Sequence, residues 1–202
     1  MPSMRGFSFS NLKSFPPITI NTNDSSIQIA ATPSQFIFNK KTGYLSSWKV
    51  EGEELLNESL GPRPNFWRGM TDNDFGNGFP ARAAYWRNVP EKLVLKESNT
   101  RSISKHEFQI KNIYELPGNA GELQMQYTIT ANGELYLQQN LKLNQSIDLP
   151  ELPKWGLSME LKTDFDDVTW YGRGPNENYW DRKTGSRFGI YQSDPRSLYE
   201  PY

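Results

Sequence analysis

Apolar and polar residues alternate along much of this 202-residue chain. The segment "ELQMQYTITANGELYLQQNLKL", residues 122–143, shows the pattern most clearly. Alternation at every second residue is typical of a β-strand with one buried and one solvated face. Asn132-Gly133, between the two runs, favours a tight hairpin turn. The segment therefore predicts an antiparallel hairpin with these buried residues: Leu123, Met125, Tyr127, Ile129, Leu135, Leu137, Leu141 and Leu143.

The same alternation recurs in shorter runs elsewhere. These runs are separated by turn sequences such as "NKKTG", in which Gly43 can take a positive φ, and "PGNAG" at 117–121. Roughly ten short strands at spacings of about 8 to 12 residues predict an all-β fold, an antiparallel sandwich or barrel. The apolar residues of the further strands are Ile27, Ile29, Phe36, Phe38, Trp48, Val50, Leu93, Leu95, Phe108, Ile110, Trp155, Leu157, Met159, Leu161, Val168 and Trp170.

Helical signals are sparse. One or two turns are expected within "PARAAYWRNV", with Pro80 at the first helical position. Parallel strands need long crossover connections, which are usually helical, and no such segments appear. The pattern therefore excludes a βα barrel within this chain.

Two segments interrupt the alternation and are rich in polar and aromatic residues. The first is "NFWRGMTDNDFGNGF", residues 65–79, and the second begins with "WYGRGPNENYWDR", residues 170–182. We expect residues 172–175, Gly-Arg-Gly-Pro, to break any strand, since Gly favours unusual dihedrals and Pro lacks a donor. The question is whether Glu177, between two asparagines, does chemistry or holds a loop in shape.

Composition removes several classes of partner. Only 36% of the residues are apolar and the mean hydropathy is -0.73, but 6 Trp, 10 Tyr and 11 Phe argue for a packed core. The net charge of -1, from 22 basic and 23 acidic residues, makes nucleic acid an unfavourable partner. No apolar run is long enough for a membrane span. The absence of Cys excludes disulfides and thiolate metal sites.

Candidate chemistry is weak when each residue is taken by itself. Glu58 and Glu177 each follow an asparagine, a pair also found at glycosidase acid/base sites, but neither follows a buried parallel strand, so we interpret both as structural. The 72–78 segment fails the calcium-loop pattern, which favours local Asx turns. His106 has no acidic setting that would support a His-based site. Alternation places most aromatic rings in the core, so sugar stacking is a minority interpretation except for the aromatics of irregular segments, which are Trp67, Trp86, Tyr171, Tyr179 and Trp180.

Four blocks together resemble a known family. They are "FNKKTGYLSSWKVEGEELL", "NFWRGMTDNDFGNG", "LPKWGLSMEL" and "WYGRGPNENYWDRKTGSRFGIYQSDPRSLYEPY". In this order they resemble the C-terminal small-chain domain of the bacterial β-galactosidases of glycoside hydrolase family 2. The resemblance runs from about residue 27 to residue 202 and covers only the first part of that domain.

The resemblance implies an antiparallel supersandwich similar to galactose mutarotase. It implies a parent enzyme that hydrolyses terminal β-D-galactosides with retention, on a separate (β/α)8 barrel. The catalytic glutamates and the magnesium and sodium ligands of the family lie in that barrel, so no catalytic, metal or cofactor role is assigned here. The expected division is a linker, leader or end of a preceding domain at 1–26 and the sandwich domain at 27–202.

The expected role is structural, namely to brace the barrel and shape the rim of its sugar site. We expect Arg173 and Arg182 to pair with acidic residues of the two irregular segments, because guanidinium binds carboxylate bidentately. Such pairs would lock the segments together. The candidate structural or rim residues are Arg68, Asp72, Asn73, Asp74, Arg173, Asn176, Glu177, Asn178, Tyr179, Asp181 and Arg182.

Three alternatives stay open from the sequence: a stand-alone carbohydrate-binding sandwich, an oligomerisation module, and a sugar mutarotase, which the isolated His106 disfavours. The expected partners are the other domains of the parent chain and, in the parent, a β-galactoside. Self-association through an open sheet edge or an uncovered apolar face is also expected. The faces proposed for it are those of residues 123–129 and 155–161. The compartment, cytoplasmic or periplasmic in a bacterium, is left open.

Overall fold

The computed structural model describes residues 11–176, 178 and 183–198. Within them lie two larger antiparallel sheets that face each other. The first has the order β1-β2-β3-β4-β5, so each strand pairs with its neighbour in sequence. A short 3-10 helix, η1 (Leu12–Ser14), precedes it, and its strands are β1 (Thr19–Thr22), β2 (Ser26–Ala31), β3 (Ser34–Asn39), β4 (Leu45–Val50) and β5 (Glu53–Glu54).

The second sheet has the order β10-β9-β8-β7 and is also a meander of neighbouring strands. A 3-10 turn, η2 (Pro117–Asn119), connects its middle strands, and Gly118 takes a φ of 71° there, as the predicted turn requires. The strands are β7 (Val94–Ser104), β8 (Glu107–Glu115), β9 (Gly121–Thr130) and β10 (Leu135–Leu143).

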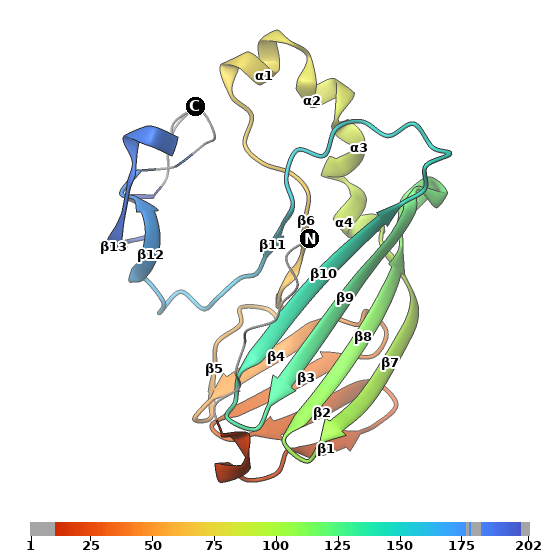
Figure 1. Cartoon of the computed structure of the whole chain (residues 1–202), viewed down its shortest axis with the longest axis vertical. Helices are drawn as coiled ribbons and strands as arrows, with labels where there is room; N and C mark the ends of the chain where they lie inside the picture. Colours follow the sequence, from red (N-terminus) through yellow and green to blue (C-terminus); the bar gives the residue numbers. More distant parts are fainter. Residues whose placement is uncertain (1–10, 177, 179–182, 199–202) are drawn as a thin grey trace.

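Two small ladders and four helical turns complete the described part. The ladders are β6 (Arg63–Asn65) with β11 (Gly156–Ser158), and β12 (Val168–Gly174) with β13 (Arg187–Ser193), the latter pair enclosing η3 (Lys183–Gly185). The helical turns are α1 (Asp72–Gly76), α2 (Phe79–Arg82), α3 (Ala84–Arg87) and α4 (Val89–Lys92). In Figure 1 the helical turns gather near one end of the four-stranded sheet, and β12 and β13 lie apart from both larger sheets.

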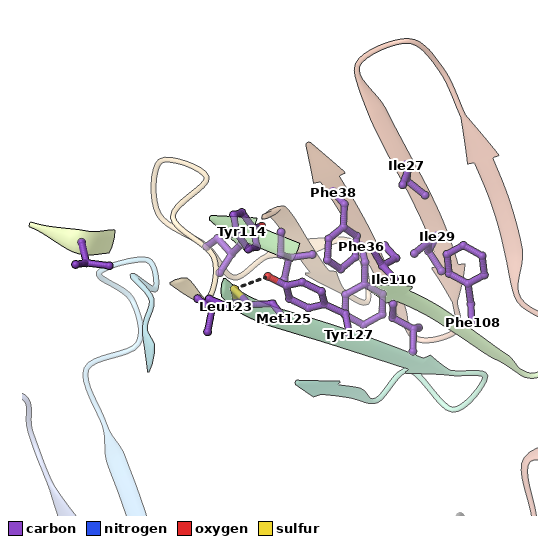
Figure 2. Packing of buried hydrophobic residues seen from close by; sticks show 14 of the residues in the cluster. Ile27, Ile29, Phe36, Phe38, Phe108, Ile110, Tyr114, Leu123, Met125 and Tyr127 are labelled. Atoms are coloured by element: carbon purple, nitrogen blue, oxygen red, sulfur yellow. Dashed lines mark hydrogen bonds between the residues drawn. The ribbon is translucent and has the colours of Figure 1, made fainter. Parts of the chain in front are cut away.

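The core lies between the two larger sheets. Phe38 of β3 meets Tyr127 of β9 edge to face, with ring centroids 4.9 Å apart. Figure 2 shows side chains from both sheets meeting in this layer. The completely or almost completely buried members include Ile29, Phe36, Phe38, Leu45, Ile110, Tyr114, Leu123, Met125, Tyr127 and Ile129. The predicted all-β antiparallel sandwich is therefore confirmed.

A tight turn joins the two sheets through backbone carbonyls. Gly43, with a φ of 73°, closes the loop between β3 and β4. Its carbonyl accepts from Asn112 Nδ2 at 2.6 Å, and the carbonyl of Thr42 accepts from the Tyr114 hydroxyl at 2.9 Å. Asn112 is fully buried, so this hydrogen bond satisfies its amide nitrogen inside the core.

The 122–143 hairpin forms as predicted. β9 and β10 pair from Leu135↔Ile129 to Leu143↔Gly121, and Gly133 in the turn has a φ of 81°. The inward residues of β9 are 0% exposed, so the expectation that Leu123 to Ile129 form an uncovered face is wrong. The opposite sheet covers them. The leucines of β10 are half-buried and pack against the same core.

Three further expectations need correction. The helical content exceeds the single predicted segment, and Pro80 lies at the second position of α2. The strand predicted around Leu93 and Leu95 begins at Val94 and runs on to Ser104. Gly-Arg-Gly does not break a strand, because β12 runs through Gly174, and Gly172 lies opposite Gly189.

The domain division at residue 27 stays a prediction. β1 lies before that position and pairs with β2 from Thr19↔Ala30 to Thr22↔Ile27. Residues 19–22 thus contribute a strand to the first sheet.

Candidate functional site

The first irregular segment is organised by Asp74. Thr71 and Asp74 form a capping box at the start of α1: the Thr71 N–H donates to Asp74 Oδ2 at 2.9 Å, and the Asp74 N–H donates to Thr71 Oγ1 at 3.4 Å. The reciprocal bonds satisfy two donors that a helix N-terminus leaves open. The Thr-x-x-Asp signal in "TDND" is present in the sequence and would have predicted this cap.

Arg68 holds the same carboxylate from the other side. Its Nη1 donates to Asp74 Oδ2 at 2.6 Å and its Nη2 donates to Oδ1 at 3.1 Å. Hydrogen bonds from Arg68, followed by those from Thr71, lower the pKa of Asp74 from 3.8 to about 2. The partner of the Asp74 carboxylate, the Arg68 guanidinium, therefore lies within the same segment. Its neighbours Asp72 and Asn73 are exposed on α1.

Trp86, which follows this segment, is structural rather than available for stacking on a ligand. Trp86 is fully buried, packs edge to face on Phe66 at 5.6 Å, and donates its Nε1–H to the carbonyl of Pro150 at 2.8 Å. Trp67 is half-buried with the Arg87 guanidinium 5.8 Å from its ring centroid. The proposed availability of Trp86 for sugar stacking is wrong, because the short helical turns fold it into the core.

The second irregular segment begins within β12, one strand of the β12–β13 hairpin. Arg173 on β12 donates from Nη1 to the carbonyls of Lys183 at 2.6 Å and Ser186 at 2.8 Å. Its guanidinium carbon also lies 4.8 Å from the ring centroid of Phe188. The described contacts of Arg173 thus lie within its own segment, and the pairing proposed with Asp72 or Asp74 is not among them.

Several candidate residues of this segment lie outside the described residues. They are Glu177, Tyr179, Asp181 and Arg182, together with Trp180. Of the flanking asparagines, Asn176 is exposed and Asn178 is half-buried. Whether Glu177 holds the loop in shape therefore stays a prediction.

The remaining single-residue candidates lie in turns. Glu58 is exposed in a turn where it has a φ of 45°. His106 lies in the turn between β7 and β8, and its carbonyl accepts from the Ala131 N–H at 2.9 Å. Among the described residues, no group of three or more His, Cys, Asp or Glu could hold a metal ion. None of the helices in the described ranges is both long and apolar enough to cross a membrane.

Exposed apolar side chains mark two surfaces. On β12–β13, Tyr171, Phe188 and Ile190 are 78%, 64% and 76% exposed. The second surface follows β11, where Trp155, Leu157, Met159 and Leu161 are 44%, 41%, 48% and 40% exposed. The predicted long strand there is short, with β11 limited to Gly156–Ser158 and a single bridge from Leu161 to Leu56.

The inner faces of the two larger sheets form the core, and the carboxylate of Asp74 is hydrogen-bonded within its own segment. These features define the class of domain: an all-β antiparallel sandwich with exposed apolar side chains on its smaller ladders. The family model described as "Beta galactosidase small chain" matches residues 30–202. The chain belongs to this family.

Curated relatives agree with the family model. The chain is 34% identical over 188 residues to a β-galactosidase of Priestia megaterium, which covers 93% of this chain and 18% of the relative. It is 30% identical over 181 residues to a β-galactosidase of Lactobacillus delbrueckii subsp. bulgaricus, covering 89% of this chain and 18% of the relative. It is 32% identical over 176 residues to a β-galactosidase of Clostridium acetobutylicum, covering 84% of this chain and 18% of the relative. The chain thus spans less than a fifth of the length of these relatives.

Proposed function

We propose that this chain is the non-catalytic small-chain domain of a β-galactosidase. The family match across residues 30–202 carries this proposal, together with the 18% share of the β-galactosidases to which the chain corresponds. The parent would be a retaining hydrolase of glycoside hydrolase family 2 acting on terminal β-D-galactosides. Magnesium and sodium, if used, would bind its barrel.

The domain would brace the barrel and shape the rim of the sugar site. Two features support a structural role. The Asp74 carboxylate is already held by Arg68 and Thr71, so its charge is engaged within its own segment. The exposed apolar side chains of the smaller ladders suit contact with further protein, since contiguous exposed apolar surface marks interaction sites.

The test is a replacement. The matched residues of the Priestia megaterium β-galactosidase would be exchanged for residues 30–202 of this chain, and hydrolysis of a chromogenic β-galactoside would be measured. We expect activity in the exchanged enzyme and none in the same enzyme with those residues deleted. A folded but inactive exchanged enzyme would count against the proposed function.

The isolated 202-residue chain is expected to show no turnover of the chromogenic substrate. Turnover abolished by Glu177→Gln or Glu58→Gln would assign catalysis to this domain and contradict the proposal.

The isolated chain is also expected to bind galactose or lactose weakly or not at all. Calorimetry giving a dissociation constant tighter than about 0.1 mM, roughly -5.5 kcal/mol, would instead favour a carbohydrate-binding module.

A further inference from the structure

β7 forms an open edge of the four-stranded sheet. In the order β10-β9-β8-β7 it pairs on one side only, with β8, and Figure 1 shows it along the outer side of that sheet. Apart from the ladder with β8, no backbone hydrogen bond within the described part of the chain involves residues 94–104. An edge strand of this kind carries a row of N–H and C=O groups that can pair with a further strand.

Both faces of β7 are exposed to water. Every residue of the strand except Leu95 is exposed, including those on the face that points toward the other sheet. Thr100 lies on that inward face, because its partner on β8 is the buried Ile110. Ser98, opposite the buried Asn112, lies there too. These faces offer little apolar surface to a partner, so the main-chain edge is the part of β7 that suits an interaction.

Two irregularities limit the length of this edge. The register with β8 shifts at Lys96 and again at Ile103, and residues 97–102 between them pair regularly. We call residues 97–102 the β7 edge. The charge of Lys96 is engaged by Glu115, with Nζ and Oε2 2.5 Å apart. Because bulges interrupt a ladder, a further strand would pair along the β7 edge and not beyond it.

The outward face of the β7 edge is complementary to itself in charge. Its outward side chains are those of Glu97, Asn99 and Arg101, which alternate with the inward ones. With a second β7 antiparallel to the first and a two-fold axis at Asn99, Glu97 of each copy lies opposite Arg101 of the other. Cross-strand partners share a face, so the arrangement forms two pairs of opposite charge. Within the described residues, neither Glu97 nor Arg101 takes part in a salt bridge.

The uncharged positions of the same register also match. Asn99 on the axis meets its own copy, and a carboxamide carries both donors and an acceptor, so two of them can hydrogen-bond to each other. Ser98 lies opposite Thr100 of the second copy on the inward face, where paired hydroxyls hydrogen-bond across strands. All positions from 97 to 101 therefore gain a suitable partner.

Other registers fit less well. Side chains alternate between faces, so a continuous sheet requires the axis at a residue and not between two residues. An axis at Glu97 or at Arg101 places like charges directly opposite each other, which is destabilising. An axis at Ser98 or at Thr100 leaves both charged residues opposite uncharged ones. Only the axis at Asn99 pairs the charges.

We propose that two copies of this chain associate through their β7 edges, antiparallel about an axis at Asn99, so that their four-stranded sheets become one continuous sheet. A second copy is the partner because a two-fold contact requires each residue and its opposite to match in both directions, as this sequence does. The contact uses only residues of this chain, so it does not depend on the proposed function. It is small and polar, and we expect a dissociation constant between about 10 μM and 1 mM.

The test uses the intact 202-residue chain. Sedimentation at increasing concentration is expected to show a monomer–dimer equilibrium. At about ten times the dissociation constant, we expect amide exchange to slow by about threefold or more at those N–H groups of the β7 edge that do not pair with β8. β1, at the edge of the other larger sheet, is the internal control and is expected to keep its exchange rates.

Charge reversals test the register. Glu97→Arg and Arg101→Glu each place like charges opposite each other at two symmetric positions, so each is expected to weaken the dimer at least about tenfold. The combined variant restores opposite charges and is expected to return to within about threefold of the original affinity. Lys41→Glu, at an exposed position in the turn between β3 and β4, is the matched control and is expected to change the affinity less than about twofold.

Three results would overturn the proposal. They are a monomer at every concentration up to about 1 mM, a dimer that neither single reversal weakens, and a folded combined variant that fails to regain association. The second result would place the contact elsewhere on the chain. An inactive exchanged enzyme would contradict the proposed function and leave the dimer unaffected.

Discussion

Asp74 lies between a guanidinium and the N-terminus of a helix, and this position controls its protonation. Its side chain is 13% exposed and that of Arg68 is 29% exposed, so water screens the pair only in part. We expect Asp74→Asn to destabilise the fold by about 1 to 2 kcal/mol, because charge-assisted bonds to Arg68 and Thr71 become neutral ones. The measurement is the urea midpoint at neutral pH, with the exposed Asp72→Asn as control.

The same residue gives a pH dependence. The folded-state pKa of Asp74 is about 2 and its usual value is 3.8, so the unfolded chain binds the proton more readily. The stability that Asp74 contributes is complete above its usual pKa and is lost as the pH falls through the range between the two values. Urea midpoints measured down to acid pH are expected to fall less steeply in Asp74→Asn. Equal slopes would contradict the assignment.

Gly43 is required at its position for two separate reasons. Its φ is 73°, and a Cβ added there would lie 2.5 Å from the Tyr114 hydroxyl and 2.7 Å from Asn112 Nδ2. We expect Gly43→Ala to cost about 2 to 4 kcal/mol, from backbone strain and from disruption of the bonds between the sheets. Gly52→Ala is the control, because Gly52 has a φ of 90° with nothing within 4 Å, so about 1 to 2 kcal/mol of strain is expected. Equal losses in thermal or urea unfolding would show that the crowding is unimportant.

At the scale of elements, the β12–β13 ladder depends on a close approach at Gly174. A Cβ there would lie 2.7 Å from the ring of Tyr191, which also contacts Trp170 at 5.5 Å between centroids. We expect Gly174→Ala to open the ladder and accelerate amide exchange in residues 187–193 by about tenfold or more. Gly185→Ala, with nothing within 4 Å, is expected to leave that exchange unchanged. Unchanged exchange in both variants would contradict the packing argument.

Elements differ in how far local sequence specified them. The β9–β10 hairpin has alternation on both arms and Asn-Gly between them, so its position followed from the sequence. β7 has the opposite character, because nearly all of its residues are exposed. Its sequence, with polar residues such as Asn99 and Arg101, shows no alternation of apolar and polar positions. It forms a strand because its backbone pairs with β8, from Val94↔Glu115 to Ser104↔Glu107. No local pattern encodes that pairing.

The candidate site was predicted to a smaller extent. The sequence identified Arg68 and Asp74 as candidates, but it offered Asp74 as one of several possible partners for an Arg of the other irregular segment and left the pairs open. The structure shows the pair six residues apart within one segment, joined by the capping box. A bidentate contact depends on where the chain turns, and composition cannot supply that geometry.

At the scale of the whole molecule, the interior contains phenols that resist ionisation. Burial raises the pKa of Tyr44 to about 12, against a smaller opposing effect of Arg63, and burial also raises the pKa values of Tyr114 and Tyr127. Tyrosines of the unfolded chain lose protons near pH 10, so stability is expected to fall above that pH by about 1.4 kcal/mol per pH unit for each such group.

The measurement is urea unfolding at increasing alkaline pH, together with phenolate absorbance. Tyr44→Phe is expected to flatten the alkaline fall, because one titrating group is removed. Phenolate formation by all 10 tyrosines near pH 10 in the folded chain would contradict the burial argument.

The sequence by itself determined the fold class, the central hairpin and the turn at Gly43, because each depends on local periodicity or on a required backbone dihedral. Tertiary structure alone decided the rest. It covered the inward face of β9 with the opposite sheet, buried Trp86 under short helical turns, and left Leu157 and Met159 beside an apolar groove. Burial and exposure of this kind depend on contacts between segments far apart in the chain, and a linear pattern does not record which distant surface covers it.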